Sequence, residues 1–210
     1  MCARYCFLGG PKLRDLFRMV EGGDLEAMVN IAPTMWALSV VAEDGEPRLR
    51  RMQWGFVPRW RKDLVGTTRQ INARSESVAE KPTFRDAFLH RRCVLPASGF
   101  YEWKGEGRTK QCHWIGLPDQ RTFGMAGVWE EWQGTPSFAI VTSGPNSQMA
   151  TVHDRMPVML FGEELLAWLV ASDHGVLQRV MAPKEFDLDI YPVDSPKDGP
   201  RPGGGQGSLF

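Results

Sequence analysis

Glycine and proline divide most of this chain into short segments of β-branched, aromatic and other apolar residues, and this division constrains the fold most. The 210 residues include 22 glycines and 15 prolines. Strands are predicted at residues 36–42, 49–54, 93–96, 112–116, 122–128 and 137–142. Helices are predicted at residues 11–20, 163–171 and 176–181. Many short strands with few helices indicate a mixed α/β (α+β) protein with an antiparallel, barrel-like β-sheet core and peripheral helices.

The length fits one domain, which we place at residues 1–194. Residues 195–210 are rich in proline and glycine, so they are predicted to form a flexible tail. No segment approaches the ~20 apolar residues of a membrane span, and the N-terminus lacks the pattern of a secretory signal. The four cysteines are scattered, which favours reduced thiols, no metal site and a cytoplasmic location. Cys6, Cys93 and Cys112 are best interpreted as small buried apolar residues.

The net charge of zero hides a strong asymmetry. Residues 48–92 hold twelve basic and four acidic residues, a net charge of +8, so the remainder of the chain carries −8. Such a window can bind phosphates in a protein that is neutral as a whole. The alternative is a solvated face that pairs with acidic residues elsewhere in the fold.

Cys2 directly follows the initiator Met1. Removal of Met1 would leave Cys2 with a free α-amine and a thiol, which titrate near ~7.7–8.0 and ~8.5 respectively. This 1,2-aminothiol can condense with an aldehyde and close to a five-membered ring. Alternatively, a cysteine falls at position 2 by chance.

Two further residues have the chemistry of proton carriers. Glu102 lies between Tyr101 and Trp103, where desolvation would favour its neutral form and suit it to proton transfer. Simple strand alternation, with Glu102 on the same face as Phe100, is the alternative. His153 lies in a polar segment and could act as a general acid or base, or as a structural hydrogen-bonding group.

Two other segments have features of a nucleic-acid interface. Asn72 and Arg74 point the same way on an extended segment, which suits one residue to orienting a substrate and the other to a phosphate. Trp60, with Arg59 and Arg61 on either side, resembles a base-stacking surface flanked by phosphate contacts. Core packing is the better interpretation of the nearby residues Trp54 and Phe56.

Taken together, seven segments in this order resemble the SRAP family, the SOS response-associated peptidases. The matching segments are Met1-Cys2-Ala3-Arg4-Tyr5, Asn30-Ile31-Ala32-Pro33-Thr34, Trp54-Gly55-Phe56-Val57-Pro58, Asn72-Ala73-Arg74-Ser75-Glu76, Arg91-Arg92-Cys93, Gly99-Phe100-Tyr101-Glu102-Trp103 and His153-Asp154-Arg155-Met156-Pro157. The resemblance extends to about Val193. It implies an SRAP-like fold and a protein that binds abasic sites in single-stranded DNA.

The resemblance also implies roles for individual residues. Family members form a thiazolidine between the N-terminal cysteine and the ring-opened deoxyribose, which protects the lesion. Carried onto this chain, Cys2 is the nucleophile, Asn72 positions the N-terminus and sugar, Glu102 shuttles protons and His153 assists ring opening. Further DNA contacts are expected from Arg4, Arg59, Trp60, Arg61 and Arg74. Met1 would be released by autoproteolysis or by an aminopeptidase, and no cofactor is implied.

The chain departs from the family pattern in three places. Ala3 stands where glycine is usual, which would strain the backbone if that position required a positive φ. Arg61 stands where a second aromatic residue is common. Tyr191-Pro192-Val193-Asp194 leads directly into the tail, whose last five residues, Gln206-Gly207-Ser208-Leu209-Phe210, resemble the peptide with which bacterial proteins bind the replicative sliding clamp. Gln206, Leu209 and Phe210 would make the contacts, and the protein would be nucleoid-associated.

Two other functions remain open at this point. An N-terminal-cysteine peptidase or amidohydrolase would use the same four residues, with the α-amine of Cys2 as base. A single-stranded DNA-binding module without catalysis would make Cys2 incidental. The +8 window favours DNA over a peptide substrate, and a Cys2→Ser substitution separates covalent capture from passive binding.

Overall fold

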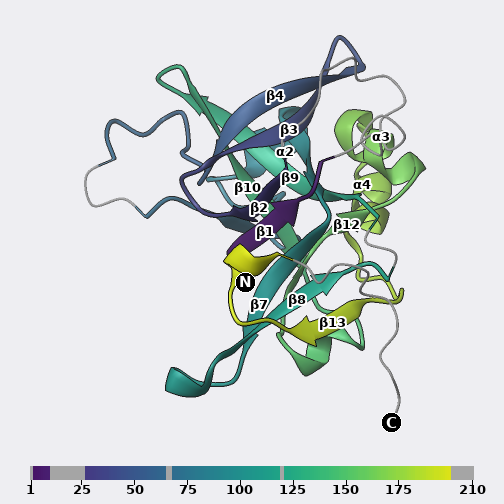
Figure 1. The fold of residues 1–210 in the computed structure, drawn as a ribbon. Coiled ribbons are helices and arrows are strands. Elements are labelled where there is room, and N and C mark those ends of the chain that lie inside the picture. Colours follow the sequence, from purple (N-terminus) through teal and green to yellow (C-terminus); the bar gives the residue numbers. More distant parts are fainter. Residues whose placement is uncertain (1, 10–26, 65–67, 119–120, 200–210) are drawn as a thin grey trace.

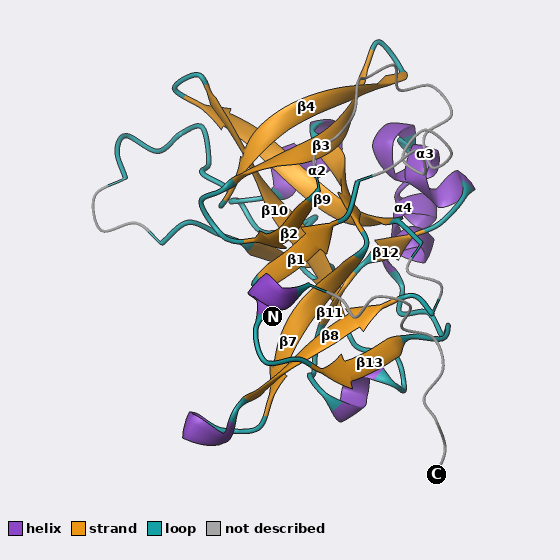
Figure 2. Cartoon of the chain, viewed as in Figure 1, coloured by secondary structure: helices purple, strands orange, loops and turns teal. Residues whose placement is uncertain are grey.

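A computed structural model describes residues 2–9, 27–64, 68–118 and 121–199. Within it, the larger sheet closes on itself (Figures 1 and 2). Strands β4, β3, β6 and β9 pair antiparallel in that order, and β10 closes the ring by pairing antiparallel with β9 and parallel with β4. The five closing strands are β3 (Trp36–Glu43), β4 (Glu46–Trp54), β6 (Arg92–Ala97), β9 (Phe123–Trp132) and β10 (Thr135–Ser143). The barrel-like core predicted from the sequence is therefore confirmed.

A second, five-stranded sheet is antiparallel throughout, with the strand order β13-β8-β7-β1-β2. Its central strand is β7, and β1 lies between β7 and the edge strand β2. Its strands are β1 (Arg4–Phe7), β2 (Met28–Ile31), β7 (Gly99–Lys104), β8 (Gln111–Gly116) and β13 (Asp189–Pro192). In Figure 1 the described N-terminal end of the chain lies beside β7. This sheet therefore brings the start of the chain to the strand that carries Glu102.

The remaining elements are short: β5, β11 and β12 extend the larger sheet, and the helices and 3-10 turns lie outside the sheets. They are β5 (Asn72–Arg74), β11 (Met156–Pro157), β12 (Met159–Leu160), α2 (Arg85–His90), α3 (Glu163–Val170), α4 (His174–Met181) and the 3-10 turns η1 (Gly107–Thr109), η2 (Met149–Thr151) and η3 (Pro196–Asp198). The two late helices follow the predicted ranges within two residues, and they lie together on one side of the barrel (Figure 2). The predicted helix at residues 11–20 lies outside the described residues.

Hairpin turns explain how two pairs of barrel strands meet. Asp44 and Gly45 join β3 to β4 with φ angles of 52° and 81°, and Gln133 and Gly134 join β9 to β10 with φ angles of 47° and 77°. Two consecutive residues with positive φ define the turn type whose twist matches that of paired strands, and Asp-Gly is one of its preferred sequences. These two local signals set the register of the adjacent strands.

The core contains the aromatic residues that the sequence assigned to it. Trp54 and Phe56 are buried, and Trp54 stacks on Phe138 and meets Tyr5 edge-on. Cys6, Cys93 and Cys112 are buried and carry free thiols, as predicted. One charged residue of the basic window also enters the interior: the guanidinium of Arg92 donates to carbonyls at the ends of both α2 and α3. Arg92 therefore stabilises the helices and is unavailable to a phosphate.

The buried thiols predict a loss of stability in alkali. Burial raises the pKa values of Cys2, Cys6 and Cys93 above the usual 9.0. The thiols therefore remain protonated in the folded protein while they ionise in the unfolded chain, so their contribution to the free energy of unfolding is constant below about pH 9 and falls above it. Each thiol contributes a slope of up to about 1.4 kcal/mol per pH unit. Urea unfolding at several pH values measures this slope, which becomes shallower in a Cys6→Ala protein. A free energy that stays constant above pH ~9 contradicts the prediction.

The last described segment of the chain ends at Gly199. The 3-10 turn η3 contacts β2, so the first residues of the predicted tail belong to the folded part. The other tail residues, from position 200 onward, lie outside the described residues. No described helix is long and apolar enough to cross a membrane.

Candidate active site

Cys2 lies two residues before β1 and is fully buried. Strand β1 pairs antiparallel with β7, where Arg4 faces Tyr101. Glu102 follows Tyr101 on β7, so the start of the chain lies next to the part of β7 that carries this carboxylate. Ala3, which replaces the glycine usual in the family, is not among the described non-glycine residues with positive φ. The strain that we considered for this position is therefore absent.

Asn72 connects a distant segment to the start of the chain. Strand β5 pairs parallel with β10, with Asn72 opposite Ile140, and the side-chain Nδ2 donates to the Cys2 carbonyl over 2.9 Å. The Asn72 Oδ1 is buried and has no hydrogen-bond partner within the described part of the chain. Asn72 thus holds the backbone of Cys2 and retains an acceptor for a nearby N–H group.

The Cys2 thiol is held in its neutral form. Burial is the largest cause that raises its pKa above the usual 9.0, and the negative charge of Glu102 is the second. The Sγ lies 3.7 Å from the Arg4 carbonyl. A thiol in this environment needs a neighbouring base when it reacts.

Glu102 is 3% exposed and projects from the middle of β7. The strand interpretation of this residue is confirmed, and the carboxylate is buried, while its role in proton transfer stays a prediction. Gly99 allows the strand to adopt this position: a Cβ there would lie 2.2 Å from the Trp114 ring, so only glycine fits. The tryptophan that packs on Gly99 lies on the neighbouring strand β8, where it also meets Tyr101 edge-on.

His153 faces Glu102 across the site, with its Nε2 4.0 Å from the Glu102 Oε2. Its Nδ1 accepts a hydrogen bond of 3.0 Å from the backbone N–H of Arg155, so the neutral ring carries its proton on Nε2, toward Glu102. In the protonated ring, Nδ1 would instead pair with Asp154, whose Oδ1 lies 2.9 Å away. The histidine can therefore exchange a proton on the side of the ring that faces the carboxylate.

Arg155 joins the His153 segment to the Asn72 segment. It forms a bidentate ion pair with Glu76, at 2.6 and 2.9 Å, and donates to the Thr142 carbonyl over 2.5 Å. The hydrogen bonds from Arg155 lower the pKa of Glu76. Sequence reasoning did not single out this pair, although both residues lie in the matching segments. Their spacing of 79 positions gives no local signal of contact.

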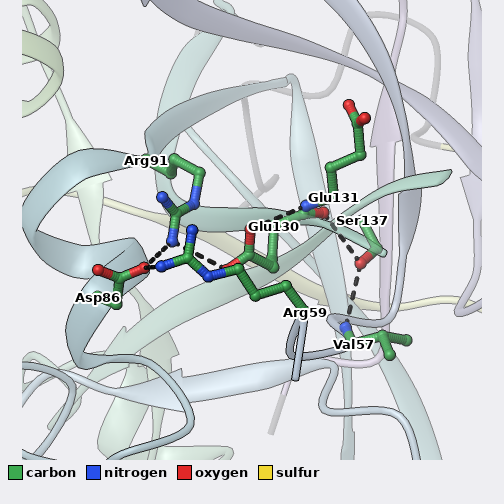
Figure 3. A network of polar contacts seen from close by, with 7 residues as sticks. All are labelled: Val57, Arg59, Asp86, Arg91, Glu130, Glu131 and Ser137. Atoms are coloured by element: carbon green, nitrogen blue, oxygen red, sulfur yellow. Dashed lines mark hydrogen bonds and ion pairs between the residues drawn. The ribbon is translucent and has the colours of Figure 1, made fainter. Parts of the chain in front are cut away.

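All five residues expected to bind DNA are at least partly exposed. Arg74 and Trp60 are exposed, Trp60 by 62%, and the Arg61 guanidinium lies 5.8 Å from the indole ring. Arg4 is partly exposed next to Cys2. The Arg59 side chain is 58% exposed but pairs with Asp86 at 2.8 Å, in the network drawn in Figure 3. Cys2, Asn72, Glu102 and His153 form one cluster, whereas Trp60 and Arg61 lie on the separate segment 57–64.

The described residues contain no group of three or more histidine, cysteine or acidic side chains that could hold a metal ion. The clamp-binding prediction for Gln206, Leu209 and Phe210 falls outside the described residues.

Comparison with known proteins gives consistent matches along the chain. Residues 1–196 match the family model described as SOS response associated peptidase (SRAP). The "abasic site processing protein YoqW" of Bacillus subtilis is 36% identical over 196 residues, covering 89% of this chain and 88% of YoqW. The "abasic site processing protein YoaM" of the same organism is 34% identical, covering 89% of this chain and 86% of YoaM. A crystal structure of a Bacteroides thetaiotaomicron protein aligns with a TM-score of 0.73 and 26% identity, over 86% of this chain and 85% of its own.

Proposed function

The chain belongs to the SRAP family, the SOS response-associated peptidases, and from this premise we propose that it captures abasic sites in single-stranded DNA through a covalent thiazolidine on Cys2. Such a crosslink would protect the lesion during replication. The observation that carries the proposal is the convergence of Asn72, Glu102 and His153 on the buried start of the chain. The relatives named as abasic site processing proteins support the substrate class.

The proposed reaction begins after Met1 has been removed, by the protein itself or by an aminopeptidase. The α-amine of Cys2 attacks the aldehyde of the ring-opened deoxyribose, and loss of one water gives an imine. The Cys2 sulfur then adds to the imine carbon, and the thiol proton is transferred to the nitrogen. The product is a five-membered thiazolidine, formed with the net loss of one water and with no oxidant or cofactor.

The four clustered residues have distinct roles in this sequence. Asn72, which holds the Cys2 carbonyl, has a buried acceptor suited to orient the new α-amine. As the hemiacetal opens, His153 gives its Nε2 proton to the ring oxygen and Glu102 takes the proton of the sugar hydroxyl. Glu102 then returns this proton to the Nε2 of His153, and the free carboxylate later carries the thiol proton to the imine nitrogen. The partly exposed Arg4 and the exposed Arg74 suit the flanking phosphates, which are the main features of a site without a base.

A denaturing gel with two matched oligonucleotides tests the proposal. One oligonucleotide carries an abasic site, and the other carries a tetrahydrofuran analogue that cannot form an aldehyde. We expect a slowly migrating species with the abasic site alone, and its mass should equal protein without Met1 plus DNA less one water. If protein that has lost Met1 forms no adduct, the proposal fails, and a peptidase or a passive DNA-binding module becomes the better interpretation.

We also propose a partner for the last five residues of the chain. Gln206-Gly207-Ser208-Leu209-Phe210 would bind the bacterial replicative sliding clamp, with Leu209 and Phe210 in an apolar pocket and Gln206 hydrogen-bonding beside it. This contact would hold the protein at replication sites, on the nucleoid.

Truncation tests the clamp contact separately from the chemistry. Deletion of residues 206–210 is expected to abolish binding to the purified clamp in a pull-down, because both apolar anchors are lost. Crosslinking to a short abasic oligonucleotide should be unchanged, since the deleted residues are not part of the cluster around Cys2. A Gly207→Ala protein, altered between the proposed contacts, is the matched control. Clamp binding that survives the deletion, or that is absent from the intact protein, contradicts the proposal.

A further inference from the structure

Trp60 is exposed although the segment that carries it is anchored at several points. The backbone N–H of Val57 donates to the Ser137 Oγ over 3.1 Å, and the carbonyl of Arg61 accepts from the Trp132 Nε1 over 2.8 Å. These contacts fix the chain on both sides of Trp60 against the hairpin formed by β9 and β10. Trp60 is 62% exposed, and a large aromatic side chain held in this way by its neighbours is suited to contact a ligand.

A third anchor lies between these two. The Arg59 guanidinium pairs with Asp86 at 2.8 Å and lies 3.9 Å from the Glu130 Oε2. Arg91 binds both of these carboxylates, with its contact to Glu130 at 2.9 Å. Figure 3 shows the two guanidinium groups beside the two carboxylates, while the side chain of Glu131 extends away from them.

The anchors lie on both sides of Trp60. Residues 57, 59 and 61 are each bonded to the body of the protein, through a backbone N–H, a side chain and a carbonyl respectively. Residues 58–61 form a turn, in which the backbone N–H of Arg61 donates to the Pro58 carbonyl over 3.0 Å, and Trp60 lies within this turn with 62% of its surface exposed. Glu130 is nearly buried, its side chain 7% exposed, so this part of the network is shielded from salt more than a surface ion pair is.

We propose that Asp86 and Trp132 are positioning residues that hold the indole of Trp60 outward as a stacking surface for a DNA base. The inference rests on the proposed function, because it concerns how the same protein binds its DNA. It also assigns Arg59 a structural role, the ion pair with Asp86, in place of the phosphate contact predicted from the sequence. An indole held in place before binding loses less conformational entropy when a base stacks on it.

Single-turnover crosslinking at several concentrations of an abasic oligonucleotide tests this role. For Asp86→Asn and Trp132→Phe we expect the half-saturating DNA concentration to rise about fivefold. The limiting rate constant should not change, because neither residue belongs to the cluster around Cys2. Glu131→Gln is the matched control: this carboxylate is adjacent in sequence but pairs with Arg50, outside the network. Trp132→Phe keeps an aromatic side chain and removes the N–H donor together with part of the indole, so one of the two variants tests the anchor without a change of charge.

The direction in which the half-saturating DNA concentration changes shows whether Arg59 positions Trp60 or binds phosphate. If Arg59 binds phosphate, Asp86→Asn releases it and tightens DNA binding, which overturns the inference. In a Trp60→Leu background, the two variants should have no further effect, since the side chain that they position is gone. Unchanged DNA binding in both variants, or an equal loss in the Trp60→Leu background, also overturns the inference. If the wild-type protein itself fails to crosslink DNA, the proposed function fails, and this inference with it.

Discussion

A Cys2→Ser protein from which Met1 has been removed is expected to form no heat-stable adduct with abasic DNA, yet borohydride should still trap it on the DNA. The serine variant retains the α-amine, so it can form the imine, and reduction converts that imine into a stable amine. It lacks the sulfur that closes the ring, and a neutral hydroxyl is a much weaker nucleophile than a thiolate. The two halves of the aminothiol chemistry thereby become separately visible.

Denaturing gels with and without borohydride measure both outcomes. Binding of abasic DNA before the reaction should stay within about twofold of wild type, because the substitution replaces one buried atom. Cys112→Ala is the matched control, since it removes another buried thiol that lies outside β1 and should retain the heat-stable adduct. A heat-stable adduct of normal yield with Cys2→Ser would exclude the thiazolidine.

A Glu102→Gln substitution is expected to slow crosslinking by about 10²-fold at saturating DNA, since general acid–base catalysis typically contributes 10²–10⁴-fold. Glutamine keeps the size of the side chain in its buried position on β7 but cannot accept a proton. The neutral thiol of Cys2 would then lose the nearby carboxylate whose charge helps to raise its pKa, and so would lose its base. Substrate affinity should change little, because the effect is on proton transfer.

Single-turnover rate constants with two comparisons measure the effect of Glu102. His153→Asn should also slow the reaction, and the double variant should be only slightly slower than Glu102→Gln, because the two groups act on the same protons. Glu106→Gln is the control, an exposed carboxylate beyond the end of the same strand, and should react at the wild-type rate. If Glu102→Gln crosslinks as fast as wild type, Glu102 does not carry the proton.

The basic residues of the +8 window have different partners in the folded protein. Arg92 binds helix carbonyls, while Arg50, Arg59 and Arg91 pair with acidic side chains. Arg61 and Arg74 are exposed. The pairing with acidic residues elsewhere in the fold is therefore observed for three residues of the window, whereas the phosphate contacts stay a prediction.

Local patterns in the sequence predicted much of the barrel. The strands β3, β4, β6, β8, β9 and β10 and the helices α3 and α4 follow the expected ranges closely, because apolar periodicity and turn residues are local signals. The unpredicted elements are β1, β2, β5, β7, β11, β12, β13 and α2, although a strand was one interpretation of the residues around Glu102 on β7. Except for β7 and α2, which have six residues, these elements are two to four residues long, too short for a pattern to emerge, and the short strands form because neighbouring strands satisfy their backbone groups.

The sequence by itself determined the chemistry available to this protein: an aminothiol at the N-terminus, and carboxylate, imidazole and amide groups in recognisable segments. Only the tertiary structure decided which of these groups meet. Asn72 reaches Cys2 across 70 positions, on a strand that pairs with β10, and His153 faces Glu102 beside the ion pair of Arg155 with Glu76. Arg59 likewise meets Asp86 only in the folded chain. Such contacts depend on strand pairing between distant segments, whose closure carries an entropic cost that only the complete fold offsets.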